Sequence, residues 1–217
     1  MIELFSKGGW VMYPLFLSSI FALAVVIERL WVLRQKKVVK PEIIAALDQT
    51  KSLGDVNLLR AICAKFDGPF AQILLTAIDN QDLPPADLRI LVEDDGRQQV
   101  RVLENRLVVL ETIASIAPLM GLFGTVLGMI KVFEVIQTIG VGQAKALSGG
   151  ISEALLTTAT GLIIGIPAVI AYNFFRNRSE SLILDMEKYV QLLLNKLIRF
   201  NDGENAEPME NLKLKNS

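Results

Sequence analysis

Glu153 is the residue of this sequence whose type and position most clearly suggest chemistry. It is the only charged residue in the run from 151 to 175, which Arg176 and Arg178 close. A charged side chain inside a membrane costs about 2.5–3.5 kcal/mol on insertion scales, so it usually faces a bundle interior or a wet cavity. A second interpretation stays open, in which Glu153 is a solvated charge at the outer interface, near the start of a helix.

Three threonines follow Glu153 in the same run. Thr157 and Thr160 lie at i+4 and i+7, which places them on the same face of an α-helix as Glu153, and Thr158 is one position round. Hydroxyls both donate and accept hydrogen bonds, so they can hold water beside a carboxylate. Serine and threonine are also common where membrane helices pack, so the hydroxyls alone do not separate a pore from a packing surface.

Small residues line one side of two apolar runs. In the run from 112 to 130, Thr125 lies beside the small residues, and Pro118 removes one backbone hydrogen bond. Both runs contain the G-x-x-x-G pattern, which favours close helix packing. We therefore predict tight packing, within one chain or between subunits, through Gly121, Gly124, Gly128, Gly161 and Gly165.

The missing residue types exclude several classes of enzyme and metal site. The 217 residues contain no histidine, which removes Ser-His hydrolases, histidine-ligated zinc and histidine proton shuttles. The single cysteine, Cys63, is expected to be a buried apolar thiol on a cytoplasmic helix. We predict no enzyme activity, no metal and no cofactor. The net charge of −1 gives no indication of a nucleic-acid partner.

Three long apolar runs predict an all-α membrane protein with three transmembrane helices. The composition is 52% hydrophobic, and each run can cross a hydrocarbon core of about 30 Å. By the positive-inside rule, the basic cluster after the first run is cytoplasmic and the N-terminus periplasmic; the cluster is Arg34, Lys36, Lys37 and Lys40. The predicted segments are a periplasmic N-terminus (1–9), spans at 10–33, 107–136 and 150–175, and a periplasmic loop (137–149).

The other segments are predicted to lie in the cytoplasm. Residues 34–106 place apolar residues at helical spacing between Gly and Pro breaks, which predicts a cytoplasmic helical domain. Its longest element should begin near Pro85 and continue without a break into the second span. Residues 176–200 predict a cytoplasmic amphipathic helix, and 201–217 a disordered tail.

Two charges at the far end of the second span, Lys131 and Glu134, are interpreted as interfacial anchors. With these set aside, three helices carrying one carboxylate do not readily enclose a pore. A ring of identical subunits can do so, with each chain supplying Glu153 to a shared lumen.

All three predicted spans, in their order, resemble the MotA/TolQ/ExbB proton-channel family. The resemblance rests on APLMGLFGTVLGMI at 117–130 and GISEALLTTATGLIIGIPAVIAYNFF at 150–175. The N-terminal GGWVMYPLF and the ERL at 28–30 are similar to the first span of ExbB-type members. The family's pore residues are a threonine in LFGTV, a glutamate in GI-x-EAL and a threonine five residues later. The resemblance assigns these roles here to Thr125, Glu153 and Thr158, and Thr157 and Thr160 are additional hydroxyls that could face the pore.

The resemblance also implies partners and a location. Family members of this type form homopentamers in the bacterial inner membrane, around two helices of an ExbD- or TolR-type single-span protein with a membrane aspartate. The assembly uses proton-motive force, and the resulting motion passes to a TonB- or TolA-type protein that spans the periplasm. An ExbB-type subunit would thereby energise TonB-dependent outer-membrane transport.

Other functions remain compatible with the same residues. A TolQ-type subunit of the Tol-Pal envelope-integrity system shares every residue named above. A MotA-type flagellar stator is disfavoured, because those chains have four spans and a larger cytoplasmic domain. A three-span scaffold without ion flow also stays open, and it predicts that Glu153 tolerates alanine or glutamine.

Overall fold

The computed structural model describes residues 8–33, 38–140 and 144–201 of the 217, and its regular elements in these ranges are α-helices. The helices divide between two compact units. The first holds the described residues up to Trp31 together with Arg106–Asn177, and the second holds those of Val32–Asn105 and from Arg178 onward. Except for Asn201, the predicted disordered tail lies outside the described residues.

The first unit consists of α2 (Met12–Val32), α8 (Leu107–Ile139) and the first part of α9 (Ala144–Asn201). All three helices are long and apolar enough to cross a membrane. Their outward side chains are large and apolar: Tyr13 is 70% exposed and Ile163 71% exposed. An apolar surface of this extent calls for lipid or partner helices around it. The prediction of an all-α chain with three helices of spanning length is confirmed.

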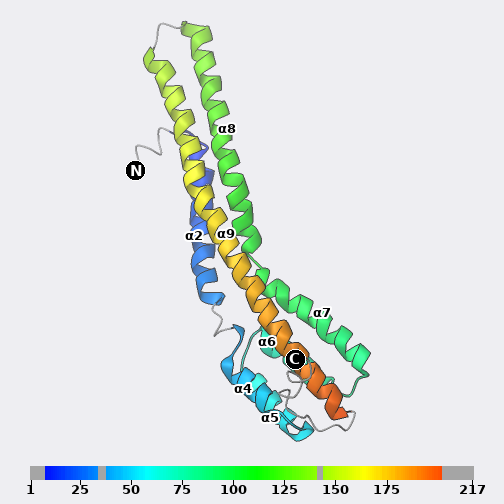
Figure 1. Cartoon of the computed structure of the whole chain (residues 1–217). Helices are drawn as coiled ribbons and strands as arrows, with labels where there is room; N and C mark the ends of the chain where they lie inside the picture. The colour runs from blue at the N-terminus through cyan, green and yellow to red at the C-terminus, as the bar shows by residue number, and fades with distance from the viewer. Residues whose placement is uncertain (1–7, 34–37, 141–143, 202–217) are drawn as a thin grey trace, which may run out of the picture. The chain divides into compact units, whose positions relative to one another are not determined.

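Within this unit α8 and α9 lie side by side and pack through their glycines (Figure 1). A methyl group on Gly161 would lie 2.6 Å from the carbonyl oxygen of Ala117 and 3.0 Å from the Cα of Gly121. A methyl group on Gly128 would lie 2.8 Å from the Cβ of Ala154. The two backbones therefore approach more closely than larger residues would allow. Of the two possibilities left by the sequence, the structure places this contact within one chain.

Pro118 and Gly165 extend the same interface. A methyl group on Gly165 would lie 2.6 Å from Cγ of Pro118, so the proline ring occupies the space that the glycine leaves. The helix α8 continues through Pro118, although a proline cannot donate the usual backbone hydrogen bond. The proline thus serves packing without ending the helix.

The helices extend beyond the apolar runs from which the spans were predicted. α8 continues to Ile139 and α9 begins at Ala144, so both reach into the segment 137–149 that was predicted as a loop. Residues 141–143 lie outside the described residues. Hydropathy locates an apolar stretch but does not locate the last turns of a helix, which are more polar.

The predicted continuous helix from Pro85 into the second span is wrong. α7 (Pro85–Glu104) ends before Asn105, whose φ of −51° and ψ of 145° are extended, and Arg106 is left-handed with φ of 65°. Asparagine is a weak helix former and is frequent at helix ends. The guanidinium of Arg106 pairs with the carboxylate of Glu28 on α2, which holds the residue in place despite its unfavourable backbone.

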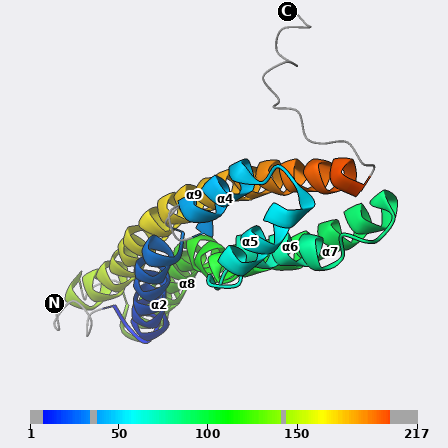
Figure 2. The ribbon, with the colours of Figure 1, turned by 90° about the horizontal axis from the view of Figure 1, so that it is seen from below.

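The second unit is a helical bundle of α4 (Pro41–Gln49), α5 (Leu53–Cys63), α6 (Pro69–Asp79), α7 and the last part of α9 (Figure 2). Proline occupies the first turn of α4, α6 and α7, where a missing N–H costs little. Ser52 and Asp55 form a capping box at the start of α5. The residues 176–200, predicted as an amphipathic helix, form the last part of α9, and their apolar side chains Leu182, Met186, Leu193 and Leu197 are buried in the core of this bundle.

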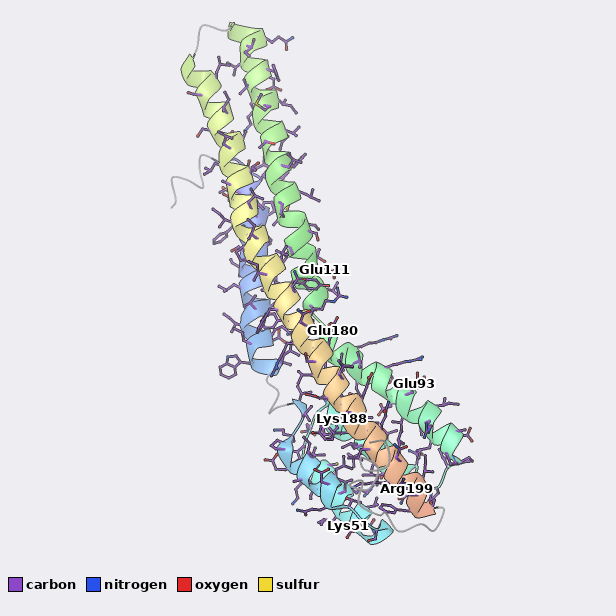
Figure 3. All side chains as sticks on the ribbon, viewed as in Figure 1. Lys51, Glu93, Glu111, Glu180, Lys188 and Arg199 are labelled. Atoms are coloured by element: carbon purple, nitrogen blue, oxygen red, sulfur yellow. The ribbon has the colours of Figure 1, made fainter. Side chains whose placement is uncertain are left out.

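Charged side chains such as Glu93 on α7 and Lys188 on α9 lie on the outside of this second bundle (Figure 3). Its interior contains Phe70, which meets the ring of Tyr189 edge-on at 6.1 Å. Cys63 is fully buried, as a structural apolar thiol would be. The second unit therefore has an ordinary amphipathic arrangement, unlike the apolar exterior of the first unit.

Candidate functional site: a paired carboxylate between α8 and α9

Glu153 is held by an ion pair with Lys131. The Nζ atom of Lys131 donates a hydrogen bond to Oε1 of Glu153 at 2.5 Å. The Glu153 side chain is 19% exposed and the Lys131 side chain 51%. The carboxylate is thus mostly enclosed, while the ammonium still reaches the surface of this single chain. Such a pair is stronger than a fully exposed one, because less water screens it.

The glycine packing explains why these two residues meet. Lys131 follows the uncharged run 112–130 on α8, and Glu153 precedes the uncharged run 154–175 on α9. Because the two helices are antiparallel and packed glycine to glycine, the end of one run lies level with the start of the other. The interpretation of Lys131 as an interfacial anchor missed this partner. The signal was present in the sequence, since opposite charges border two apolar runs joined by a short segment.

The backbone just before α2 also approaches Glu153. Gly9 has a left-handed φ of 69°, and a methyl group there would collide with Oε1 of Glu153. The next residue, Trp10, packs edge-on against Phe123 of α8, with ring centroids 6.3 Å apart. A carboxylate from α9, an ammonium from α8 and a glycine backbone before α2 therefore form one site. Sequence reasoning did not include Gly9, although two adjacent glycines before an aromatic residue were a visible signal.

Thr158 connects the two packed helices. Its Oγ1 donates to the carbonyl oxygen of Gly121 across the interface, at 3.0 Å. This hydrogen bond depends on the glycine at position 121, because a side chain there would fill the space in which α9 packs against α8. Thr158 is partly buried. Its hydroxyl therefore fixes the register between α8 and α9 at the level of the glycines.

Thr157 lies in the interface rather than on an open wall. It has no exposed surface, and a methyl group on Gly124 would collide with its side chain. Its hydroxyl donates to the Ala154 carbonyl oxygen at 2.9 Å. The expectation that Thr157 could face a pore does not fit this burial, because the chain's own α8 covers the residue. Helical spacing identified the face shared with Glu153 but not what packs against that face.

Thr125 and Thr160 both turn their hydroxyls back onto their own helices. Thr125 donates to the Leu122 carbonyl oxygen at 2.6 Å, and Thr160 to that of Leu156 at 2.8 Å. Both residues are partly exposed in the single chain. Of the residues predicted for the pore, Glu153 and Thr158 thus have partners on a neighbouring helix, and Thr125 and Thr160 have local ones. Among the described residues, no group of three or more His, Cys, Asp or Glu gathers as metal ligands would.

The sequence of this chain is similar to those of known proteins. The chain is 30% identical over 205 residues to an ExbB-like biopolymer transport protein (ExbB-like 3) of Synechocystis sp., covering 90% of this chain and 94% of that protein. It is 41% identical over 90 residues to the biopolymer transport protein ExbB of Aquifex aeolicus, covering 42% of this chain and 61% of that one. It is also 48% identical over 81 residues to the Tol-Pal system protein TolQ of Pseudomonas aeruginosa, covering 37% and 35%.

The family match includes parts of both units. Residues 65–188 match the family described as the MotA/TolQ/ExbB proton channel family. The match begins after α5 and includes α6, α7, α8 and α9 as far as Lys188, with the paired carboxylate of Glu153. This chain, a multi-pass membrane protein with three helices of spanning length, therefore belongs to the MotA/TolQ/ExbB proton channel family.

Proposed function

We propose that this chain is an ExbB-type subunit of a proton-driven motor in the bacterial inner membrane. The observation that carries the proposal is Glu153, a mostly enclosed carboxylate on a helix of spanning length in a chain of this family. In the proposal five copies surround an ExbD-type single-span partner, with their N-termini in the periplasm. Glu153, Thr125 and Thr158 line the path along which the partner's membrane aspartate is protonated.

The proton-motive force supplies enough free energy to drive such a motor. One charge crossing 100 mV releases about 2.3 kcal/mol, so a few protons per step can drive a conformational change. A neutralised aspartate can turn within an apolar lumen dotted with hydroxyls, whereas a charged one would lose its solvation. The motion would then pass to a TonB-type protein and energise outer-membrane transport.

The test is Glu153→Ala and Glu153→Gln in the complex reconstituted with its partner in proteoliposomes. We expect proton uptake to fall to background in both variants while the oligomer, measured by native mass, is retained. Glu134→Gln is the matched control, since Glu134 is an exposed carboxylate on the neighbouring α8. Wild-type proton uptake by Glu153→Ala would sink the pore assignment and favour a scaffold without ion flow.

A TolQ-type role is the second candidate, and the 48% identity to TolQ over 81 residues supports it. The two roles share Thr125, Glu153 and Thr158, so the distinction must come from phenotype. Deletion should impair growth under limiting iron if the chain energises TonB-dependent transport. Detergent sensitivity with normal growth under limiting iron would instead assign it to the Tol-Pal system.

A further inference from the structure

The carboxylate of Glu153 is contacted by two segments that lie far from it in the sequence. The Lys131 ammonium binds Oε1 at 2.5 Å, and the Gly9 backbone approaches the same oxygen so closely that it excludes a side chain. Gly9 is itself held next to Trp10, whose ring packs against Phe123. A solvated charge at a helix start would need none of these contacts. The geometry is that of an anion with a dedicated partner.

Charge and burial decide how firmly this arrangement holds the carboxylate. Burying a charged group without a partner costs free energy. A close ammonium offsets that cost by direct attraction and a charge-assisted hydrogen bond. The Glu153 side chain is only 19% exposed, so its orientation is set more by the Lys131 ammonium than by water.

We propose that Lys131 and Gly9 are positioning residues that hold the Glu153 carboxylate in one orientation beside the proton path. This inference rests on the proposed function of the same site and adds how the carboxylate is placed there. Lys131 binds Oε1 of Glu153, and the Gly9 backbone limits the orientations open to that oxygen. Glu153 then attracts protons toward the path and accepts hydrogen bonds from passing donors, without being the group that carries the proton across.

Infrared spectroscopy of the purified chain tests the pairing directly. The difference between the wild type and Glu153→Gln gives the carboxyl absorption of Glu153. Lys131→Met, measured against Lys131→Met/Glu153→Gln, should change that absorption because the carboxylate loses its partner. Lys131→Arg, which keeps the positive charge, should match the wild type. A Glu153 absorption that is unchanged in Lys131→Met overturns the proposal, whatever the variant's activity.

Proton uptake by the complex in proteoliposomes tests the consequence. Lys131→Met should lower the uptake by about tenfold, the size expected when a close charge pair is broken, and Lys131→Arg should restore most of it. If Glu153→Gln loses uptake but Lys131→Met keeps the wild-type rate, the proposed function stands and this inference fails. If Glu153→Gln also keeps the wild-type rate of proton uptake, the proposed function fails, and the inference that rests on it fails with it. Full recovery of proton uptake in the charge swap Lys131→Glu/Glu153→Lys would show that the ion pair only links α8 to α9. That result would overturn the inference.

Gly9 has its own matched control. Gly9→Ala strains a backbone of positive φ and also pushes on Glu153, whereas Gly140→Ala strains another backbone of positive φ, 80°, with nothing within 4 Å of the added methyl group. We expect Gly9→Ala to lower proton uptake and to shift the carboxylate band of Glu153. Gly140→Ala should do neither. Equal behaviour of the two alanine variants would contradict a positioning role for Gly9.

Discussion

The ammonium of Lys196 lies 2.7 Å from the carbonyl oxygen of Leu47 and donates a hydrogen bond to it. The same Nζ donates to the carbonyl oxygen of Thr50 at 2.9 Å. Leu47 and Thr50 stand at the end of α4, where the last carbonyls of a helix have no partner within the helix. A lysine from α9 therefore caps a helix 146 residues earlier in the sequence, and its positive charge suits the negative end of the helix dipole.

Lys196→Met should weaken the attachment of α4 to the second unit. The variant keeps the aliphatic stem but loses charged hydrogen bonds, worth about 1.5–3 kcal/mol in total after partial exposure is considered. Hydrogen exchange of the α4 amides should therefore accelerate by one to two orders of magnitude. Lys188→Met is the control, because Lys188 is exposed and lies 5.6 Å above the ring of Tyr189 without capping a helix. Equal acceleration in both variants would refute the cap.

Gly161→Ala should destabilise the pairing of α8 with α9. The added methyl group would lie 2.6 Å from the Ala117 carbonyl oxygen, and backbone cannot move aside as a flexible side chain can. Overpacking of this kind costs about 1–3 kcal/mol. The control is Gly149→Ala on the same helix, where nothing lies within 4 Å and alanine should be neutral or slightly stabilising. Unfolding in detergent with increasing SDS measures the difference.

Thr158→Val should loosen the same interface by removing the hydrogen bond to the Gly121 carbonyl oxygen. We expect a loss of about 0.5–1.5 kcal/mol in the free energy of unfolding, and recovery in Thr158→Ser. Thr160→Val should change stability less, because Thr160 bonds only within its own helix. If the two valine variants lose equal stability, the cross-helix bond contributes nothing measurable.

Cys63 should resist thiol reagents until the second unit opens. Burial raises the pKa of this thiol to about 11 from an ordinary 9.0, so the reactive thiolate is scarce in the folded chain at pH 8. Maleimide labelling should therefore be slow in the native chain and fast in denaturant. Rapid labelling of the folded protein at pH 8 would show that Cys63 is accessible.

The same burial makes stability depend on pH in a defined window. The folded thiol binds its proton more tightly than the unfolded one, so its contribution is fully present below pH 9 and is lost as the pH rises to about 11. The wild type should thus lose about 2.7 kcal/mol more than Cys63→Ala across that window, since each pKa unit corresponds to about 1.36 kcal/mol. Parallel pH profiles of the two proteins would contradict this linkage.

Hydropathy and small-residue spacing predict much of this structure. Long apolar runs locate α2, α8 and the first part of α9, and proline breaks locate the starts of α6 and α7. The G-x-x-x-G patterns identify the faces through which Gly128 and Gly161 pack. Each of these signals is local in the sequence, because apolar periodicity and breaks at Gly or Pro depend on neighbouring residues only.

The features that sequence reasoning missed depend on contacts between distant residues. Asn105 and Arg106 interrupt the helix without glycine or proline, and the Arg106 conformation is held by Glu28 on α2. The burial of Thr157 is decided by Gly124 on the other helix. Lys131 acquires its role only when α8 and α9 are antiparallel at the observed register. Such outcomes require the tertiary packing to be known first.

The pair formed by Lys131 and Glu153 also bears on how the nascent chain enters the bilayer. Inserted separately, each helix would carry a lone charge at the end of its apolar run, at a cost below the about 2.5–3.5 kcal/mol of a charge at a helix centre. Inserted together as a hairpin, the two charges neutralise each other as the glycine faces close. Biogenesis of this protein should therefore favour simultaneous release of α8 and α9 from the translocon over stepwise release.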